Sequence, residues 1–122
     1  MRTDNVLLDK SKSFAIRIIR LYKYLREKKK EYILADQILR SGTSIGSNSR
    51  ESRRAEGIKD FVHKLNIALK EADETAYWLE LLIATDYISE KEFESLYIDC
   101  EELIKLLTSI INTAKRNNNS KF

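Results

Sequence analysis

The chain has 122 residues, enough for one domain whose core forms without metal, and its one cysteine excludes an internal disulfide. Proline is absent and glycine occurs three times, which is typical of long helices rather than sheets. The net charge is +3. No run of about 18 apolar residues occurs and the N-terminus is too charged for a signal peptide, so we expect a cytoplasmic protein without a membrane span.

The first predicted helix covers residues 9–30. Its apolar residues recur at helical spacing and fall on one arc of about 100°. These residues are Phe14, Ile18, Leu21, Tyr22 and Leu25. The helix closes with a run of cations, which suits the negative end of a helix dipole.

Residues 32–56 admit two interpretations. The stretch "RSGTSIGSNSRES" contains two glycines and five serines, which favours a loop, since each glycine costs about 1 kcal/mol in a helix. At a spacing of about 3.5 residues, however, small and apolar residues form a continuous seam that predicts a helix. The seam consists of Ala35, Ile38, Gly42, Ile45, Ser49 and Ser52. In that helix we expect Gly42, Ile45, Gly46 and Ser49 to allow close packing against a partner helix.

The third predicted helix covers residues 59–86. Gly57 is interpreted as a left-handed stop of the preceding helix, and Asp60 as the N-cap of this one. The apolar arc is about 160° wide, which indicates contact with more than one neighbouring helix. Its seam is Ile58, Phe61, Leu65, Ala68, Ala72, Thr75, Leu79 and Leu82.

The fourth predicted helix covers residues 89–115. Ser89 and Glu92 have the spacing of a capping box, and Ile88 can pack on Phe93 across the first turn. A near-heptad seam then extends to Ala114, before a polar tail over 116–122 that we expect to be disordered. The four segments predict an all-α protein, an up-and-down antiparallel four-helix bundle forming a single domain over residues 1–115.

The two halves of the chain differ in charge. Residues 1–56 carry 14 Lys and Arg against 7 Asp and Glu, a net +7, whereas residues 57–122 carry 8 against 12, a net −4. Candidate nucleic-acid-binding residues are Arg17, Arg20 and Lys23 on the first helix and Arg40, Arg50 and Arg54 on the second. The same charges also suit pairing with the acidic half of a neighbouring subunit, or plain solvation.

Apolar residues outside the main seams suggest a homo-oligomer interface. They are Ile16, Ile19, Ile67, Trp78 and Leu81. Mixed apolar and charged stripes of this kind suit an interface core with a polar rim, although another helix of the same bundle can also cover such residues.

No residue set points to catalysis, a metal or a cofactor. His63 lies opposite the apolar seam of its helix without a second His or Cys at ligand spacing, and Cys100 sits on the seam of the fourth helix. A di-metal carboxylate bundle needs Glu-x-x-His pairs, and the chain has none. We therefore expect a protein that is not an enzyme, and we interpret its acidic residues as solvated: Glu71, Asp73, Glu74, Glu80, Glu101 and Glu102.

Four segments resemble a known bacterial family of four-helix bundles. They are "FAIRIIRLYKYL", "QILRSGTSIGSNSRES", "KDFVHKLNIALKEADETAYWLELL" and "EELIKLLTSIINTAK", which together span most of residues 5–115. The family was first noted as proteins encoded in intervening sequences of 23S ribosomal RNA genes. One departure is Ser52, which stands where relatives often have a small apolar residue after the glutamate of "N-x-x-E".

The resemblance implies a bundle with the glycine- and serine-rich stretch inside its second helix, no known catalytic activity and a tendency to form homopentamers. A related branch, the accessory variability protein of diversity-generating retroelements, acts as a basic scaffold for a reverse transcriptase and RNA. We therefore expect a scaffold that binds RNA or DNA, or a partner that handles them, through its first two helices. The alternative is a structural module whose basic and acidic halves pair between subunits.

Overall fold

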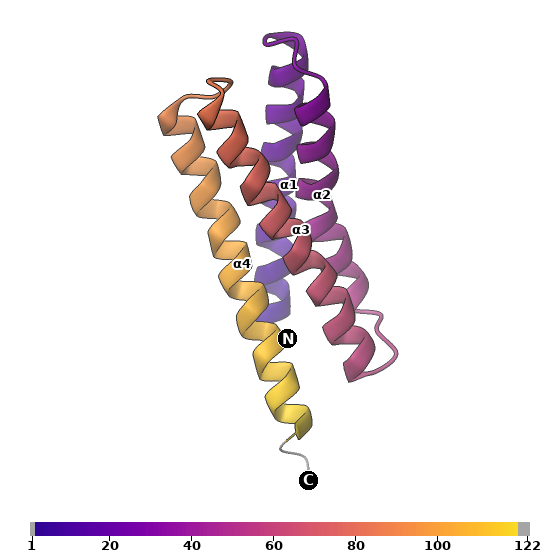
Figure 1. Ribbon diagram of the computed structural model, residues 1–122. Coiled ribbons are helices and arrows are strands. Elements are labelled where there is room, and N and C mark those ends of the chain that lie inside the picture. Colours follow the sequence, from indigo (N-terminus) through magenta and orange to yellow (C-terminus); the bar gives the residue numbers. More distant parts are fainter. Residues whose placement is uncertain (1, 120–122) are drawn as a thin grey trace.

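The computed structural model describes residues 2–119, and side chains from 6 to 118. Four helices follow one another with short turns: α1 (Arg2–Glu27), α2 (Ile33–Ser52), α3 (Ile58–Ala84) and α4 (Glu90–Asn119). Each runs antiparallel to the one before it, and contacts link α1 to α2, α2 to α3, α3 to α4 and α4 back to α1 (Figure 1). This confirms the predicted all-α four-helix bundle.

The apolar seams form one core between the helices. On α2 every seam residue is buried, including Gly42 and the hydroxyl residues Ser49 and Ser52, so the glycine- and serine-rich stretch is helix and not loop. The largest fully buried side chains come from all four helices. They include Phe14, Ile18, Leu25, Ile38, Ile45, Leu65, Leu79, Leu82, Leu103 and Leu107.

Two helices are longer than expected. α1 begins at Arg2 rather than at residue 9, because Leu7 lies one heptad before Phe14 and is 2% exposed in the same core. α4 continues to Asn119, past the expected end at residue 115. The expected disorder is therefore wrong for residues 116–119, where no proline or glycine stops the helix from propagating. Residues 120–122 of the expected tail lie outside the described residues.

The α2–α3 connection also differs from expectation. α2 ends at Ser52 instead of residue 56, through three successive i to i−3 hydrogen bonds, the last from Ala55 N–H to the Ser52 carbonyl at 3.2 Å. Gly57 has an extended backbone (φ 166°), so it is not the left-handed stop that we predicted. It is itself the N-cap of α3, and Asp60 instead accepts a hydrogen bond from Glu56 N–H at 3.1 Å.

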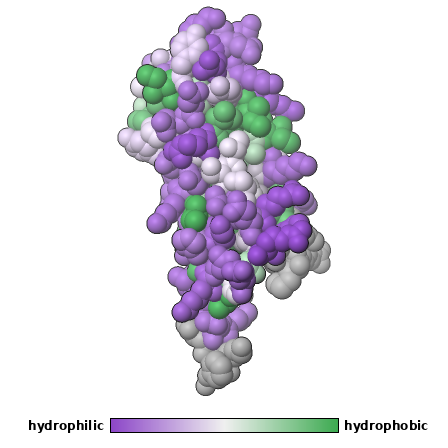
Figure 2. Space-filling view, turned by 90° about the vertical axis from the view of Figure 1, so that its right-hand side faces the viewer, coloured by the Kyte–Doolittle hydropathy of each residue, from purple (hydrophilic) through white to green (hydrophobic). Residues whose placement is uncertain are grey.

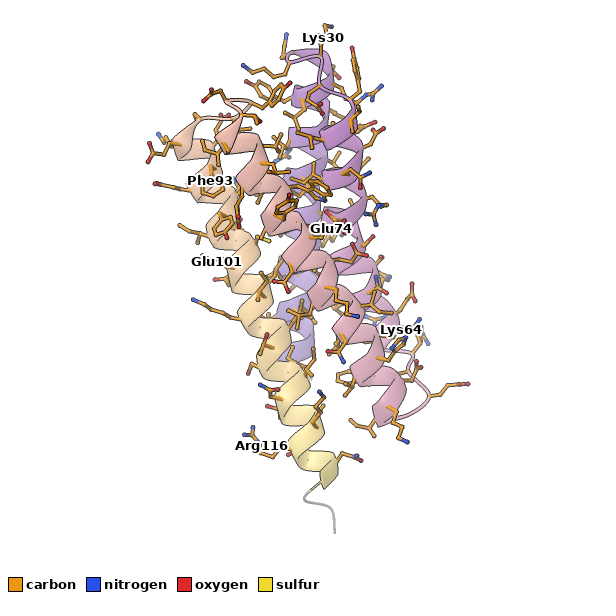
Figure 3. All side chains as sticks on the ribbon, viewed as in Figure 1. Lys30, Lys64, Glu74, Phe93, Glu101 and Arg116 are labelled. Atoms are coloured by element: carbon orange, nitrogen blue, oxygen red, sulfur yellow. The ribbon has the colours of Figure 1, made fainter. Side chains whose placement is uncertain are left out.

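The other two turns contain non-glycine residues in left-handed conformations. Lys30 (φ 55°) lies at the tip between α1 and α2 (Figure 3), and Asp86 (φ 64°) follows α3. At the turn between α1 and α2, Glu31 caps the start of α2. Its carboxylate accepts hydrogen bonds from the backbone N–H groups of Leu34 at 2.6 Å and Ala35 at 3.1 Å. α3 ends at Ala84 and α4 begins at Glu90, each within two residues of the predicted limits.

α1 and α2 approach each other at the two glycines. A Cβ atom on Gly42 would lie 2.8 Å from both Cγ1 and Cγ2 of Ile18, closer than atoms can pack. The three atoms nearest to a Cβ on Gly46 would all belong to Ser11, with Oγ at 3.4 Å, which is ordinary contact. Both glycines therefore face a partner helix as predicted, but only Gly42 is needed for the close approach.

The N-terminus of α4 is held by the predicted capping box. Ser89 Oγ accepts the Glu92 N–H at 3.1 Å, and the Glu92 carboxylate accepts the Ser89 N–H at 2.8 Å. These hydrogen bonds lower the pKa of Glu92 below its usual value. Ile88 is 5% exposed, and Phe93 packs against the core that contains Ile88.

We predict different stability changes at the two glycines. In Gly42→Ala the added methyl group collides with Ile18, an overpacking cost of about 1–3 kcal/mol that outweighs or cancels the gain in helix propensity. In Gly46→Ala the methyl group fits, and replacing a helical glycine raises the free energy of unfolding by about 0.5–1 kcal/mol. Urea denaturation followed by circular dichroism measures both. A Gly42→Ala variant as stable as Gly46→Ala would contradict the close contact.

We also predict that Ser89→Ala lowers the free energy of unfolding by about 1 kcal/mol, because it removes the side-chain acceptor of the Glu92 N–H.

The Glu92 carboxylate contributes a pH-dependent part of the free energy of unfolding. Since its pKa is lower in the folded chain, its stabilisation is present above the ordinary pKa of 4.5 and is lost as pH falls through the folded pKa. The stability difference between the wild type and Glu92→Gln should therefore shrink in acid, as thermal melts across this pH range can test. A difference independent of pH would contradict the capping role.

Candidate nucleic-acid interface

The first feature of the basic surface is a groove between α1 and α2. It has a volume of about 580 Å³ and lies over Gly46, where the absence of a side chain leaves room. Lys12, Arg50 and Arg53 line it together with one acidic residue, Asp9. The hydroxyl groups of the lining donate to backbone carbonyls of their own helices, as Ser47 does to Ser44 at 3.2 Å. The cations are therefore the side chains in this groove that suit a phosphate.

Six cations of the first two helices and the turn after α2 have no acidic partner among the side chains from 6 to 118. They are Lys12, Arg20, Lys23, Arg50, Arg53 and Arg54. Four of them were predicted as nucleic-acid-binding residues. Arg54 lies beyond the end of α2, so it does not share that helix with Arg40 as predicted.

The other two predicted cations are held in ion pairs. Arg17 contacts Asp99 at 2.7 Å and also donates to the hydroxyl and carbonyl oxygens of Ser95, on α4. Arg40 contacts Glu74 at 2.6 Å and lies 3.8 Å from Glu71, on α3. The predicted Arg40, Arg50 and Arg54 thus do not form one surface, because Arg40 points to α3 whereas Arg50 lines the α1–α2 groove.

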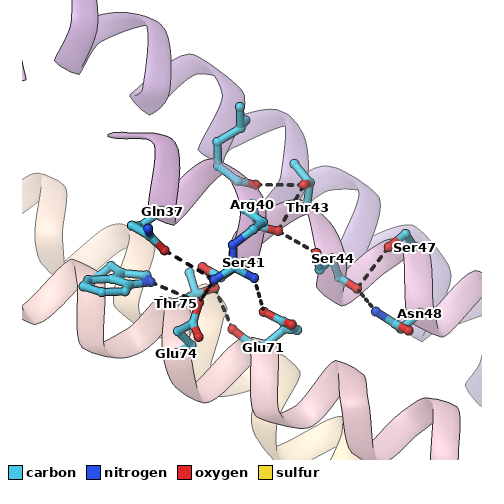
Figure 4. A network of polar contacts seen from close by, with 12 residues as sticks. Gln37, Arg40, Ser41, Thr43, Ser44, Ser47, Asn48, Glu71, Glu74 and Thr75 are labelled. Carbon is cyan, nitrogen blue, oxygen red and sulfur yellow. Dashed lines mark hydrogen bonds and ion pairs between the residues drawn. The ribbon is translucent and has the colours of Figure 1, made fainter. Parts of the chain in front are cut away.

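Arg40 belongs to a polar network between α2 and α3 (Figure 4). Beneath it, the buried hydroxyl groups of Ser41 and Thr75 share a hydrogen bond of 2.8 Å. Burial raises the pKa of Glu71, whose Oε1 atom is enclosed and accepts no hydrogen bond from the described residues. The indole N–H of Trp78 donates to Glu74 at 3.3 Å. The charged groups of this network therefore link α2 to α3 within the chain.

Apolar side chains remain on the outside of the bundle. Ile16 and Ile19 on α1 are 40% and 39% exposed. Ile67, Trp78 and Leu81 on α3 are half-buried, and Trp78 packs against the core. On the face shown in Figure 2, hydrophobic side chains gather in the upper half, whereas the lower half is mostly hydrophilic.

The candidate reactive groups are not assembled into a site. Cys100 is buried, its thiol contacts the Ala72 carbonyl at 3.3 Å, and burial raises the pKa of the thiol to about 12. His63 is exposed on α3. Within residues 2–119, no three His, Cys, Asp or Glu side chains are close enough to hold a metal ion. In the same range no helix is both long and apolar enough to cross a membrane.

Sequence reasoning missed three residues of the basic surface. Arg53 was missed because α2 was expected to continue past it, and Lys12 because it stands beside apolar residues of α1. Lys91 is the second residue of α4, and its place in a groove with Arg20 depends on how α1 and α4 pack.

Comparison with known proteins places the chain in a family. Residues 3–109 match the family described as 23S rRNA-intervening sequence protein. A crystal structure of a protein of unknown function from the S23 ribosomal protein family of Bacteroides thetaiotaomicron is similar, with a TM-score of 0.89 and 57% sequence identity. The alignment covers 90% of this chain and 98% of that one. No curated protein matches the chain. The chain therefore belongs to the 23S rRNA-intervening sequence protein family, as its sequence segments indicated.

Proposed function

We propose that this protein is a non-enzymatic, homo-oligomeric scaffold that binds RNA, or another nucleic acid, through the surface of α1 and α2. The observation that supports this proposal is the set of six cations there without an acidic partner among the described side chains. Unpaired Lys and Arg side chains attract a polyanion most strongly, because no neighbouring carboxylate neutralises them.

The cations are spread along the helices at intervals that suit a phosphate backbone. Lys12 and Lys23 are eleven residues apart on α1, which corresponds to about 16 Å along the helix axis. Arg50 and Arg53 add charge on the opposite wall of the α1–α2 groove. Neutralisation of several phosphates releases counterions and drives binding without reading the base sequence. The surface therefore suits a scaffold that holds a strand, or supports a reverse transcriptase on it, rather than one that selects a sequence.

Oligomerisation would multiply the contacts between the protein and the phosphates of a bound strand. The exposed Ile16 and Ile19 lie on α1 among charged residues, an arrangement that suits an interface core with a polar rim. We propose a ring of identical subunits, a pentamer as the family resemblance implies. Each subunit would then present its own α1–α2 groove to one bound strand.

The second candidate function is a module that assembles by charge pairing between subunits. Much of that charge is already paired within the chain: Lys10 with Glu102 and Arg17 with Asp99 join α1 to α4, and Lys64 with Glu51 joins α3 to α2. The cations of the basic half that have no ion pair among the described side chains lie on α1, in the α1–α2 turn and at the end of α2. This distribution favours nucleic-acid binding over pairing between subunits.

We predict that Arg50→Glu with Arg54→Glu weakens RNA binding at least tenfold. The slope of log affinity against log salt should fall by about one for each phosphate that the variant no longer neutralises. Fluorescence anisotropy of a labelled single-stranded RNA at several salt concentrations measures both quantities. Light scattering on the same samples measures the mass of the assembly, which should not change.

The matched control is Lys70→Glu with Lys105→Glu, which changes the net charge equally on α3 and α4, where both side chains are exposed. This variant should retain most of the binding. Equal losses in the two double variants would show a net-charge effect and contradict a localised surface. Dissociation of the Arg50→Glu, Arg54→Glu assembly, with no RNA binding by the wild type at low salt, would favour the second candidate function.

We further predict that Cys100 does not react as a nucleophile in the folded protein. With a pKa of about 12, its thiolate fraction near pH 8 is about a thousandfold below that of a free thiol, and burial also blocks access. A thiol-reactive dye should label the native chain very slowly and the urea-unfolded chain rapidly. Rapid labelling of the native chain would contradict the structural role of Cys100.

A further inference from the structure

A second groove lies on the other side of α1, against α4. α1 packs more loosely on α4 than on α2, and the space between them has a volume of about 500 Å³. That volume is within the range of small-molecule sites, about 300–1,000 Å³. The lining comes from Arg17, Arg20, Leu21 and Tyr24 on α1 and Lys91, Glu92, Ser95 and Leu96 on α4.

The base of this groove is apolar and one wall is aromatic. Leu21 and Leu96 are 9% and 6% exposed, so their side chains close the groove toward the core. Tyr24 is half-buried and packs against the same core, which holds its ring in place. The ammonium group of Lys29 lies 5.9 Å from the centre of that ring and adds positive charge near the groove. A flat apolar group is the kind of ligand that such walls accommodate.

The groove is lined by three cations, of which one is held in an ion pair and two have no acidic partner among the described side chains. The Arg17 guanidinium is fixed by Ser95 and Asp99, so it is a structural member of the wall. Arg20 on α1 and Lys91 on α4 both line the groove, and neither has an acidic partner among the described side chains. The one carboxylate of the lining, Glu92, is engaged by the Ser89 N–H in the cap of α4. The lining therefore has three positive charges against one negative charge.

We propose that this groove binds a nucleoside monophosphate unit, with the base against Tyr24, Leu21 and Leu96 and the phosphate between Arg20 and Lys91. The floor of the groove is apolar and its rim carries cations, so it suits a ligand that is flat and apolar at one end and anionic at the other. Inorganic phosphate lacks the flat end, and a nucleoside lacks the anionic end. The unit is either a free nucleotide or one residue of a single strand. The two grooves share no lining residue, although Arg20 also belongs to the six cations on which the proposed function rests.

The test compares AMP, adenosine and inorganic phosphate as probes of the full chain in nuclear magnetic resonance titrations. AMP should shift the backbone signals of Ser95 and Leu96 in a saturable way and bind about tenfold or more tightly than either fragment, because it uses both the ring and the cations. Equal affinity for AMP and inorganic phosphate would overturn the proposal, as would the absence of saturable binding.

Variants locate the site. Arg20→Gln and Lys91→Gln should each weaken AMP binding by about fivefold or more, since each removes a charge-assisted hydrogen bond to the phosphate. Tyr24→Leu should reduce the preference for AMP over phosphate. The matched control is Lys12→Gln, in the other groove, which should leave AMP binding unchanged. An equal loss in Lys12→Gln would overturn the assignment, and circular dichroism checks that each variant is folded.

The source of the nucleotide is then distinguished in the Arg50→Glu, Arg54→Glu background, where we expect the α1–α2 surface to bind RNA at least tenfold more weakly. If the groove takes one residue of a strand, a short oligoadenylate should displace AMP from it. If the groove takes only the free nucleotide, the oligoadenylate should leave AMP bound. A failure of RNA binding by the α1–α2 surface would not alter either result, so the two proposals fail separately.

Discussion

The contact between Gly42 and Ile18 is the constraint on which the geometry of the α1–α2 pair depends. A Cβ atom at residue 42 would lie 2.8 Å from two Ile18 carbons, so the separation of the helices at this level is set by the missing side chain. One turn further along α2, a Cβ atom on Gly46 would make ordinary contact with Ser11. Gly46 and Ser11 line the groove beside Lys12 and Arg50. The two glycines therefore differ in role, since Gly42 allows the close approach in the core and Gly46 lies in the surface groove.

The distribution of charge follows from the same packing. Acidic side chains of α3 and α4 lie opposite cations of α2 and α1, as in the Arg40–Glu74 and Arg17–Asp99 pairs, and neutralise them. Between α1 and α2 the described side chains form one ion pair, from Arg26 to Asp36 at 3.6 Å, near the turn that joins these helices. The remaining cations there face solvent. Cations are therefore paired with acids at the α2–α3 and α1–α4 interfaces, whereas most cations beside the α1–α2 interface have no acidic partner among the described side chains.

Much of this fold could be predicted, and the failures have particular causes. Helical periodicity and the capping box identified all four helices, because both depend on neighbours a few residues apart. The end of α2 was misplaced because Gly57 was interpreted from its residue type, whereas three i to i−3 hydrogen bonds end the helix at Ser52. α4 was cut short because polar residues after Ala114 suggested a tail, although a helix already held by its core residues continues through them.

The sequence by itself determined the helical class, the buried seams, the small residues of α2 and the excess of cations in the first half of the chain. These depend on residue type and local spacing. Only the tertiary structure decided which cations remain unpaired, since Arg17 and Arg40 meet their acids across distances of 82 and 34 residues. It also decided that Arg20 and Lys91 share a groove. The physical reason is that the rotation and depth of each helix depend on packing against its neighbours, which no local pattern records.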